Sequence, residues 1–225
     1  MISKLSHHFK KVIYLHVLIG FGMVHAGSYE DFFTAIKRDE PAKIKVLLNR
    51  GFDANTPDPK GQSGLYAALS GEEPSLKAAE VLVDWQKTDV NLLNVKGESP
   101  LMLAVLKGYR PLAEKLIAKG ADINKTGWTP LHYASSGGQP AMVALLLENS
   151  AYIDAESPNG STPLMMAAMY GNVDTVKVLL EEGADTSLKN QQGLTALQFA
   201  QRGNRPDSVN AIAASIRSKR PAGTW

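Results

Sequence analysis

Few side chains in this sequence could carry out catalysis. The chain has no cysteine, and four of its five histidines lie within residues 1–26, which leaves His132 as the only histidine of the remaining chain. A zinc site built from histidine and cysteine is therefore excluded, and a Ser-His-Asp nucleophile would have to use His132. Two acidic pairs, Glu72–Glu73 and Glu181–Glu182, are expected on solvated helix ends rather than in a cleft. The sequence predicts no catalytic site, no metal site and no cofactor.

The element that carries His132 recurs along the chain. His132 lies in the segment Thr129-Pro-Leu-His-Tyr-Ala134, and similar segments precede and follow it. The copies are residues 30–35, 63–68, 99–104, 129–134, 162–167 and 195–200, so the intervals between their starts are 33, 36, 30, 33 and 33. The intervals of 36 and 30 sum to two normal periods, which means that an early insertion is offset by a later deletion. A period of this length indicates a stack of supersecondary units.

Each copy has the features of a short helix that is followed by a second helix. A Thr or Ser before Pro is an N-cap followed by a residue that suits the first helical position. Ala recurs at the sixth position, and we expect Ala134 and Ala167 to be buried where copies pack together. The glycines predicted to end the first helix in a left-handed conformation are Gly108, Gly138 and Gly171. An apolar stripe follows in the second helix, which should stop at Gly51, Gly120 and Gly183.

The copies resemble ankyrin repeats. The matching residues include Trp128-Thr-Pro-Leu-His-Tyr-Ala134, Gly120-Ala-Asp-Ile-Asn124 and Gly183-Ala-Asp185. The resemblance implies an all-α solenoid of about six helix–turn–helix units with finger loops, over residues 27–217, with the first and last units acting as caps. It also implies that His132 hydrogen-bonds within its own loop and helix start. The second copy departs from the pattern at Trp85–Asn91, so we expect an irregular loop there.

Net charge argues against nucleic acid as a partner. From Gly27 onward the chain has 21 basic and 22 acidic residues, a net charge of −1. A nearly neutral body lacks the basic field that binding to the phosphate backbone requires. We therefore expect no nucleic-acid binding, and we expect a monomer.

Residues 1–26 have the composition of a secretion signal. Three lysines precede a mostly apolar run at positions 12–24, and Val24-His-Ala26 matches the small residues that signal peptidase accepts. An uncleaved membrane anchor is the alternative, but the run is short for a hydrocarbon layer of ~30 Å. We expect cleavage after Ala26, no stable membrane anchor afterwards and a periplasmic or secreted protein. A bacterial source is favoured, because glycans on the sequons at Asn124 and Asn159 would obstruct the finger loops. Residues 218–225 should form a flexible tail.

The resemblance to ankyrin repeats also implies where a partner would bind. That family uses the concave side, which is formed by the finger loops and the exposed edge of each first helix. Several of the corresponding positions here are apolar or aromatic, and we expect them to form a continuous exposed strip. An alternative for Trp128 is that the shortened fourth finger lets it fold back and pack on its own repeat. The predicted partner-binding residues are Leu106, Trp128, Met169, Tyr170, Leu194 and Arg202.

Two functions remain open from the sequence. One is a non-catalytic interaction scaffold in an exported compartment. The other is a dedicated inhibitor, such as an immunity protein that neutralises a toxic enzyme. Both require a protein partner, and nothing in the repeats identifies it.

Overall fold

The computed structural model describes residues 24–219 of the chain, with the side chains described from Gly27 onward. Within that part all regular structure is helical, as predicted, apart from one isolated bridge between Pro57 and Ser63. Most of the predicted signal, residues 1–23, and the end of the predicted tail, residues 220–225, lie outside the described residues. The predicted cleavage site after Ala26 falls in the first turn of helix α2.

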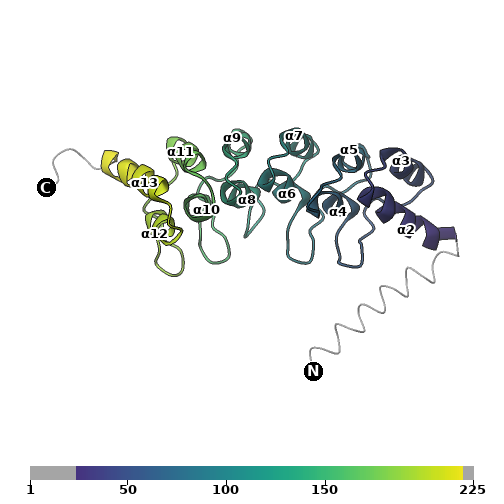
Figure 1. Cartoon of the computed structure of the whole chain (residues 1–225), viewed down its shortest axis with the longest axis horizontal. Helices are drawn as coiled ribbons and strands as arrows, with labels where there is room; N and C mark the ends of the chain where they lie inside the picture. Colours follow the sequence, from purple (N-terminus) through teal and green to yellow (C-terminus); the bar gives the residue numbers. More distant parts are fainter. Residues whose placement is uncertain (1–23, 220–225) are drawn as a thin grey trace, which may run out of the picture.

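The helices form two parallel rows joined by hairpin-like connections (Figure 1). One row, here called the inner helices, consists of α2 (Val24–Lys37), α4 (Gly64–Ser70), α6 (Pro100–Leu106), α8 (Pro130–Ser136), α10 (Pro163–Tyr170) and α12 (Ala196–Arg202). The other row, the outer helices, consists of α3 (Pro41–Asn49), α5 (Leu76–Asp84), α7 (Arg110–Ala118), α9 (Pro140–Glu148), α11 (Val173–Glu181) and α13 (Pro206–Ser218). The described chain therefore contains six helix pairs, the number that the repeat predicts.

Five loops leave the outer helices and project to the side of the inner helices before each new pair begins (Figure 1). They are named here by the pair that they precede: finger 2 (50–63), finger 3 (85–99), finger 4 (119–129), finger 5 (149–162) and finger 6 (182–195). Finger 4 is three or four residues shorter than the others, which is the deletion seen as the shortest interval of the repeat. The finger loops and the exposed sides of the inner helices together form the surface called the inner face below.

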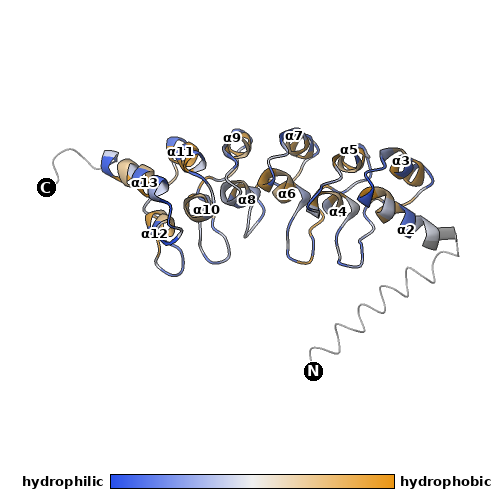
Figure 2. Ribbon diagram, viewed as in Figure 1, coloured by the Kyte–Doolittle hydropathy of each residue, from blue (hydrophilic) through white to orange (hydrophobic). Residues whose placement is uncertain are grey.

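The core lies between the two rows and runs continuously through the stack. The repeated alanines are fully buried, including Ala134 and Ala167 at 0% exposure, which confirms the predicted register. From α6 to α12, neighbouring inner helices pack on one another more extensively than neighbouring outer helices do. Apolar residues follow both rows, whereas the fingers are mostly hydrophilic (Figure 2). No pair of helices could bury its apolar faces alone, so stacking supplies most of the stability.

Four of the inner helices, α4, α6, α8 and α10, begin at side-chain caps, as predicted. Ser63, Ser99, Thr129 and Thr162 each accept a hydrogen bond from a backbone N–H in the first turn of their helix. A proline follows the cap in α6, α8 and α10, where its missing N–H costs no helical hydrogen bond.

One prediction for the helix ends was wrong. Gly108 and Gly138 have positive φ angles of 75° and 63°, but Gly171 has φ −77° and needs no left-handed conformation. Its small size serves another purpose, because a Cβ at Gly171 would lie 2.5 Å from the backbone oxygen of Ser135. Glycine at 171 therefore allows α10 to end against the preceding inner helix.

The loop after α5 is irregular, as its departure from the repeat predicts. Trp85 has an extended conformation with φ −70° and ψ 123°. The other outer helices that lead into fingers end at a residue with positive φ, namely Gly51, Gly120, Ser150 and Gly183. At the C-terminal end, α13 continues to Ser218, one residue past the predicted domain boundary.

Within the described residues, none of the helices is long and apolar enough to cross a membrane.

Candidate functional site

His132 has a structural role at the start of α8. Its Nδ1 accepts a hydrogen bond from the Thr129 N–H at 3.2 Å, and its Nε2 donates to the Ser161 carbonyl of the next finger at 2.9 Å. The side chain is 0% exposed, and burial lowers the pKa of the imidazole, so it stays neutral near pH 7. A neutral histidine with both ring nitrogens engaged has no free position for general base catalysis.

The acidic pairs also lack the arrangement of a catalytic site. All four residues are exposed: Glu72 and Glu73 lie in the connection between α4 and α5, not at a helix end as expected, and Glu181 and Glu182 lie at the end of α11. Over residues 24–219, no group of three or more His, Cys, Asp or Glu side chains is placed to hold a metal ion.

The six predicted partner-binding residues differ in how far they are exposed. Tyr170, the last residue of α10, is 54% exposed, and Arg202 at the end of α12 is also exposed. Leu106, Met169 and Leu194 are only partly exposed, because they also pack against the core. The binding role of the six residues stays a prediction.

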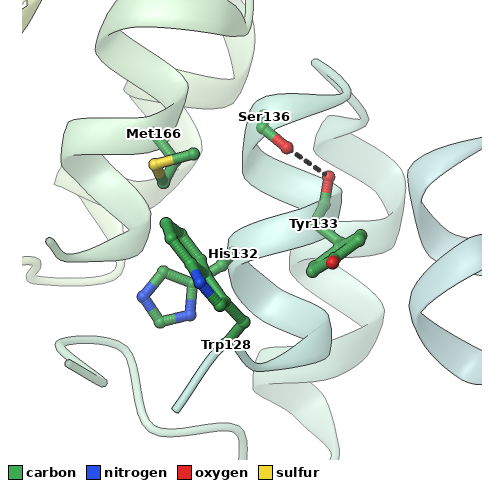
Figure 3. Close-up of a pocket in the computed structure, with 5 residues that line it drawn as sticks. All are labelled: Trp128, His132, Tyr133, Ser136 and Met166. Carbon is green, nitrogen blue, oxygen red and sulfur yellow. Dashed lines mark hydrogen bonds between the residues drawn. The ribbon is translucent and has the colours of Figure 1, made fainter. Parts of the chain in front are cut away.

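Trp128 belongs to the shortened finger 4 and lies in a hollow of the inner face. Its indole meets the His132 ring edge-on, with centroids 5.3 Å apart and an interplanar angle of 79°. The side chain is partly exposed and lines a pocket of about 220 Å³. Tyr133 and Ser136 from α8 and Met166 from α10 complete the lining with His132 (Figure 3). Trp128 thus packs on its own repeat and also presents an aromatic surface, and its binding role stays a prediction.

A polar cluster that the sequence analysis missed lies next to this pocket. The Glu98 carboxylate, at the end of finger 3, accepts hydrogen bonds from the hydroxyls of Tyr66 at 2.6 Å and Tyr133 at 2.9 Å. Asn94 donates its side-chain amide to the same carboxylate at 2.7 Å. Tyr66 comes from α4 and Tyr133 from α8, so the cluster connects the second, third and fourth helix pairs. We call these four residues the Glu98 cluster.

The cluster holds a negative charge at a fixed place. Burial alone would raise the pKa of Glu98, but the hydrogen bonds from Tyr66, Asn94 and Tyr133 outweigh burial and lower the pKa. Burial and the hydrogen bond to Glu98 raise the pKa of both Tyr66 and Tyr133. At neutral pH the carboxylate is therefore charged and the two tyrosines keep their protons.

A second hollow of about 550 Å³ lies at the N-terminal end of the inner face. It is bordered by α2, finger 2 and the end of α4, and its lining includes Phe33, Lys37, Gln62 and Glu73. No aromatic side chain of this hollow belongs to the predicted partner-binding set.

The comparisons with known proteins agree with this arrangement. The family model described as ankyrin repeats (3 copies) matches residues 32–126, 73–157 and 151–220. The chain belongs to the ankyrin repeat family. Proteins of this fold are generally non-enzymatic scaffolds that bind other proteins.

The relatives among characterised proteins share the repeats only. The rat ankyrin repeat and SAM domain-containing protein 6 is 33% identical over 109 residues, which is 47% of this chain and 12% of the rat protein. The Xenopus tropicalis neurogenic locus notch homolog protein 1 is 31% identical over 116 residues, which is 50% of this chain and 4% of that protein. This ankyrin chain thus spans only a small part of the length of those relatives.

Solved structures match more of the chain. An ankyrin repeat domain from Acinetobacter baumannii has a TM-score of 0.70 and 25% identity, and the match covers 82% of this chain and 97% of that one. The ankyrin repeat domain of human ASB11 has a TM-score of 0.71 and 28% identity, with 82% of each chain covered. A chain in the complex of a Bdellovibrio bacteriovorus predatory endopeptidase with an immunity protein has a TM-score of 0.68 and 28% identity, with 82% of this chain and 97% of that chain covered.

Proposed function

We propose that this ankyrin repeat protein binds a protein partner through its inner face, in an exported compartment. The observation that carries the proposal is the pocket beside finger 4, where Trp128, Tyr133 and Met166 present aromatic and apolar surface. Aromatic side chains in a concave, partly desolvated position are the usual anchors of protein interfaces. The exposed Tyr170 and Arg202 extend this surface toward the C-terminal pairs.

Site-specific photo-crosslinking tests the choice of face. A photoreactive phenylalanine analogue is placed at Tyr170, which is 54% exposed on the inner face, or at Val46, which is 46% exposed on the outer helix α3. The proposal requires a discrete crosslinked protein from position 170 and none from position 46. Crosslinking from position 46 alone would assign partner binding to the outer helices.

Export rests on the composition of residues 1–26, in which three lysines are followed by an apolar run. Cleavage after Ala26 would leave a protein of residues 27–225, which would begin three residues into α2. The intact mass of protein released from the periplasm should match residues 27–225. Full-length protein in the membrane fraction would contradict export with cleavage.

An inhibitor is the second candidate function, and one comparison favours it. The structure with the immunity protein shares this fold over 97% of the matched chain and includes an enzyme, the predatory endopeptidase. An inhibitor acting in this way would cover its partner's active site. Once the crosslinked partner is identified, its activity is measured with increasing amounts of this protein. Activity that falls to zero at equal stoichiometry supports the inhibitor, and unchanged activity supports the scaffold.

A further inference from the structure

The side chains of the Glu98 cluster direct three hydrogen-bond donors at the carboxylate. Both tyrosine hydroxyls and the Asn94 amide point their protons at the carboxylate. Glu98 and Tyr133 offer a ligand only acceptors, namely the remaining lone pairs of the Glu98 carboxylate and of the Tyr133 oxygen. Both residues are partly exposed, whereas Tyr66 is only 4% exposed. An exposed carboxylate whose tyrosine neighbours have no further proton to donate favours a ligand rich in donors, and ammonium and guanidinium groups are such donors.

The charge of the cluster is not compensated by an ion pair. Five ion pairs occur in the described part of the chain, and Glu98 takes part in none of them. The hydrogen bonds to the carboxylate come from neutral side chains, and the nearby charge of Lys96 lowers the pKa of Glu98 without forming an ion pair, so the carboxylate can still accept a cation from outside. A charge-assisted hydrogen bond to a pre-positioned carboxylate is stronger than one between neutral groups.

The cluster and the Trp128 pocket share one side chain. Tyr133 donates its hydroxyl to Glu98 and also lines the pocket of about 220 Å³ with Trp128 and Met166. An anionic acceptor and an apolar hollow thus lie on either side of one tyrosine. Aromatic rings beside a carboxylate also attract a cation through their π faces.

We propose that the inner face binds a lysine or arginine side chain of the protein partner at Glu98, while an apolar side chain next to it fills the Trp128 pocket. This inference rests on the proposed function, because it assigns a partner chemistry to the same face. The partner segment therefore has a basic residue adjacent to a large apolar or aromatic one.

The hydrogen bonds of the cluster also have a purely structural explanation, because they join three helix pairs. A purely structural clamp would stabilise the junction where the longest and the shortest intervals of the repeat meet, without binding a cation. The experiment has to separate the two roles.

Short peptides test the site without the natural partner. The probes are N-acetyl-Phe-Arg-amide and N-acetyl-Arg-Phe-amide, each compared with a version in which neutral citrulline replaces arginine. The readout is the indole N–H resonance of Trp128 in a nitrogen-labelled sample, assigned with Trp128→Phe. A saturable shift is expected with at least one arginine peptide and at least a tenfold weaker effect with its citrulline version. No saturable shift, or equal shifts for arginine and citrulline, would overturn the proposal.

Two variants place the cation at Glu98. Glu98→Gln removes the charge and should abolish the difference between the arginine and citrulline peptides. Glu156→Gln removes an exposed charge of finger 5 and should leave that difference unchanged. If Glu98→Gln lowers the melting temperature but keeps the preference for arginine, the cluster is a structural clamp only. Because the peptide comparison uses the unmodified protein, the test does not depend on the folding of either variant.

Once the natural partner is identified, a missing cation site at Glu98 can be distinguished from a missing binding role of the inner face. Crosslinking from position 170 together with an unchanged dissociation constant for Glu98→Gln would overturn the cation site and leave the inner face as the binding surface. A tenfold or greater loss of affinity for Glu98→Gln, with a weaker salt dependence, would support the cation site.

Discussion

The fourth residue of the repeated six-residue segment helps to cap the start of four inner helices. Met102, His132, Met165 and Gln198 differ in chemistry, yet each accepts a hydrogen bond from the backbone N–H of the preceding cap residue. Tyr66 occupies the same position and instead donates its hydroxyl to Glu98. The same position therefore serves the fold in the last four repeats and builds the Glu98 cluster in the second.

His132 should make stability depend on pH. Above about pH 6.5 the imidazole is neutral in both the native and the unfolded chain. Burial lowers the native pKa of His132, so below about pH 6.5 the unfolded chain binds a proton that the native protein does not. The free energy of unfolding then falls with decreasing pH, by up to about 1.4 kcal/mol per pH unit until the native pKa is reached.

The variant His132→Gln isolates this effect, because Gln198 caps its own helix at the same position. Urea denaturation at about pH 7.5 and about pH 5.5 should show a smaller loss of stability for the variant than for the natural protein. Equal losses in the two proteins would mean that His132 does not stay neutral in the fold.

The residues of the site were predicted from the sequence only in part. The motif places Trp128 beside a helix start, and the short interval before it indicates a truncated finger, so its position could be predicted. The Glu98 cluster could not, because its members come from three helix pairs, and their approach depends on how the longest and the shortest intervals of the repeat position finger 3. A carboxylate at a finger position with tyrosines in the neighbouring inner helices is the signal that could have indicated it.

At the scale of the elements, a ladder of asparagines joins consecutive fingers. Asn55, Asn91 and Asn124 each donate to a backbone carbonyl of the next loop and accept from a backbone N–H there. Asp154 holds the same position in finger 5 and accepts from the Asp185 N–H, but an ionised carboxylate has no N–H to donate. The ladder is therefore incomplete at finger 5.

Asp154→Asn should complete the ladder and stabilise the protein by about 0.5–1.5 kcal/mol, since the asparagine amide can add one hydrogen bond. Glu148→Gln removes an exposed charge of the adjacent α9 and serves as a control with no expected gain. Chemical denaturation of both variants checks this. A loss of stability in Asp154→Asn would show that the carboxylate has a role of its own.

The packing of α8 against the neighbouring inner helices can be tested by enlarging a buried alanine. Ala134 is 0% exposed between neighbouring inner helices, so Ala134→Leu should overpack the stack and destabilise it by roughly 1–3 kcal/mol. Ala141 on α9 is exposed, and Ala141→Leu should change the melting temperature little. Similar melting temperatures for both variants would contradict the packing of α8 on its neighbours.

The elements were the most predictable part of the molecule. Caps, prolines and the repeated alanine are local signals that each copy carries, so six pairs and their register could be derived from them. Gly171 does end its helix, as predicted, but not because it is left-handed. A small residue is needed there because the backbone carbonyl of Ser135, in another repeat, lies too close for a Cβ. Likewise, Leu106, Met169 and Leu194 pack against the core through contacts that a single copy does not specify.

At the scale of the whole molecule, the stack presents one long inner face with a gap in its row of fingers. Finger 4 is shorter than its neighbours, and the pocket around Trp128 lies beside it. Finger 3, on one side of the gap, carries the exposed apolar side chains of Leu93 and Val95, at 47% and 80% exposure. A partner segment that approaches through this gap would reach the pocket and Glu98 together, which is the basis for one extended binding surface.

Partner binding at the Trp128 pocket is tested by measuring the affinity of Trp128→Ala for the partner captured at position 170, together with the melting temperature of the variant. Truncating a central aromatic anchor costs ~2 kcal/mol of binding, so affinity should fall about thirtyfold. The melting temperature should fall only slightly, because Trp128 lines an open pocket. Tyr152→Ala removes an aromatic residue that is 68% exposed and does not line the pocket, and it should leave affinity unchanged. Unfolding of Trp128→Ala, with normal binding by whatever remains folded, would show that Trp128 is a packing residue and that the partner binds elsewhere.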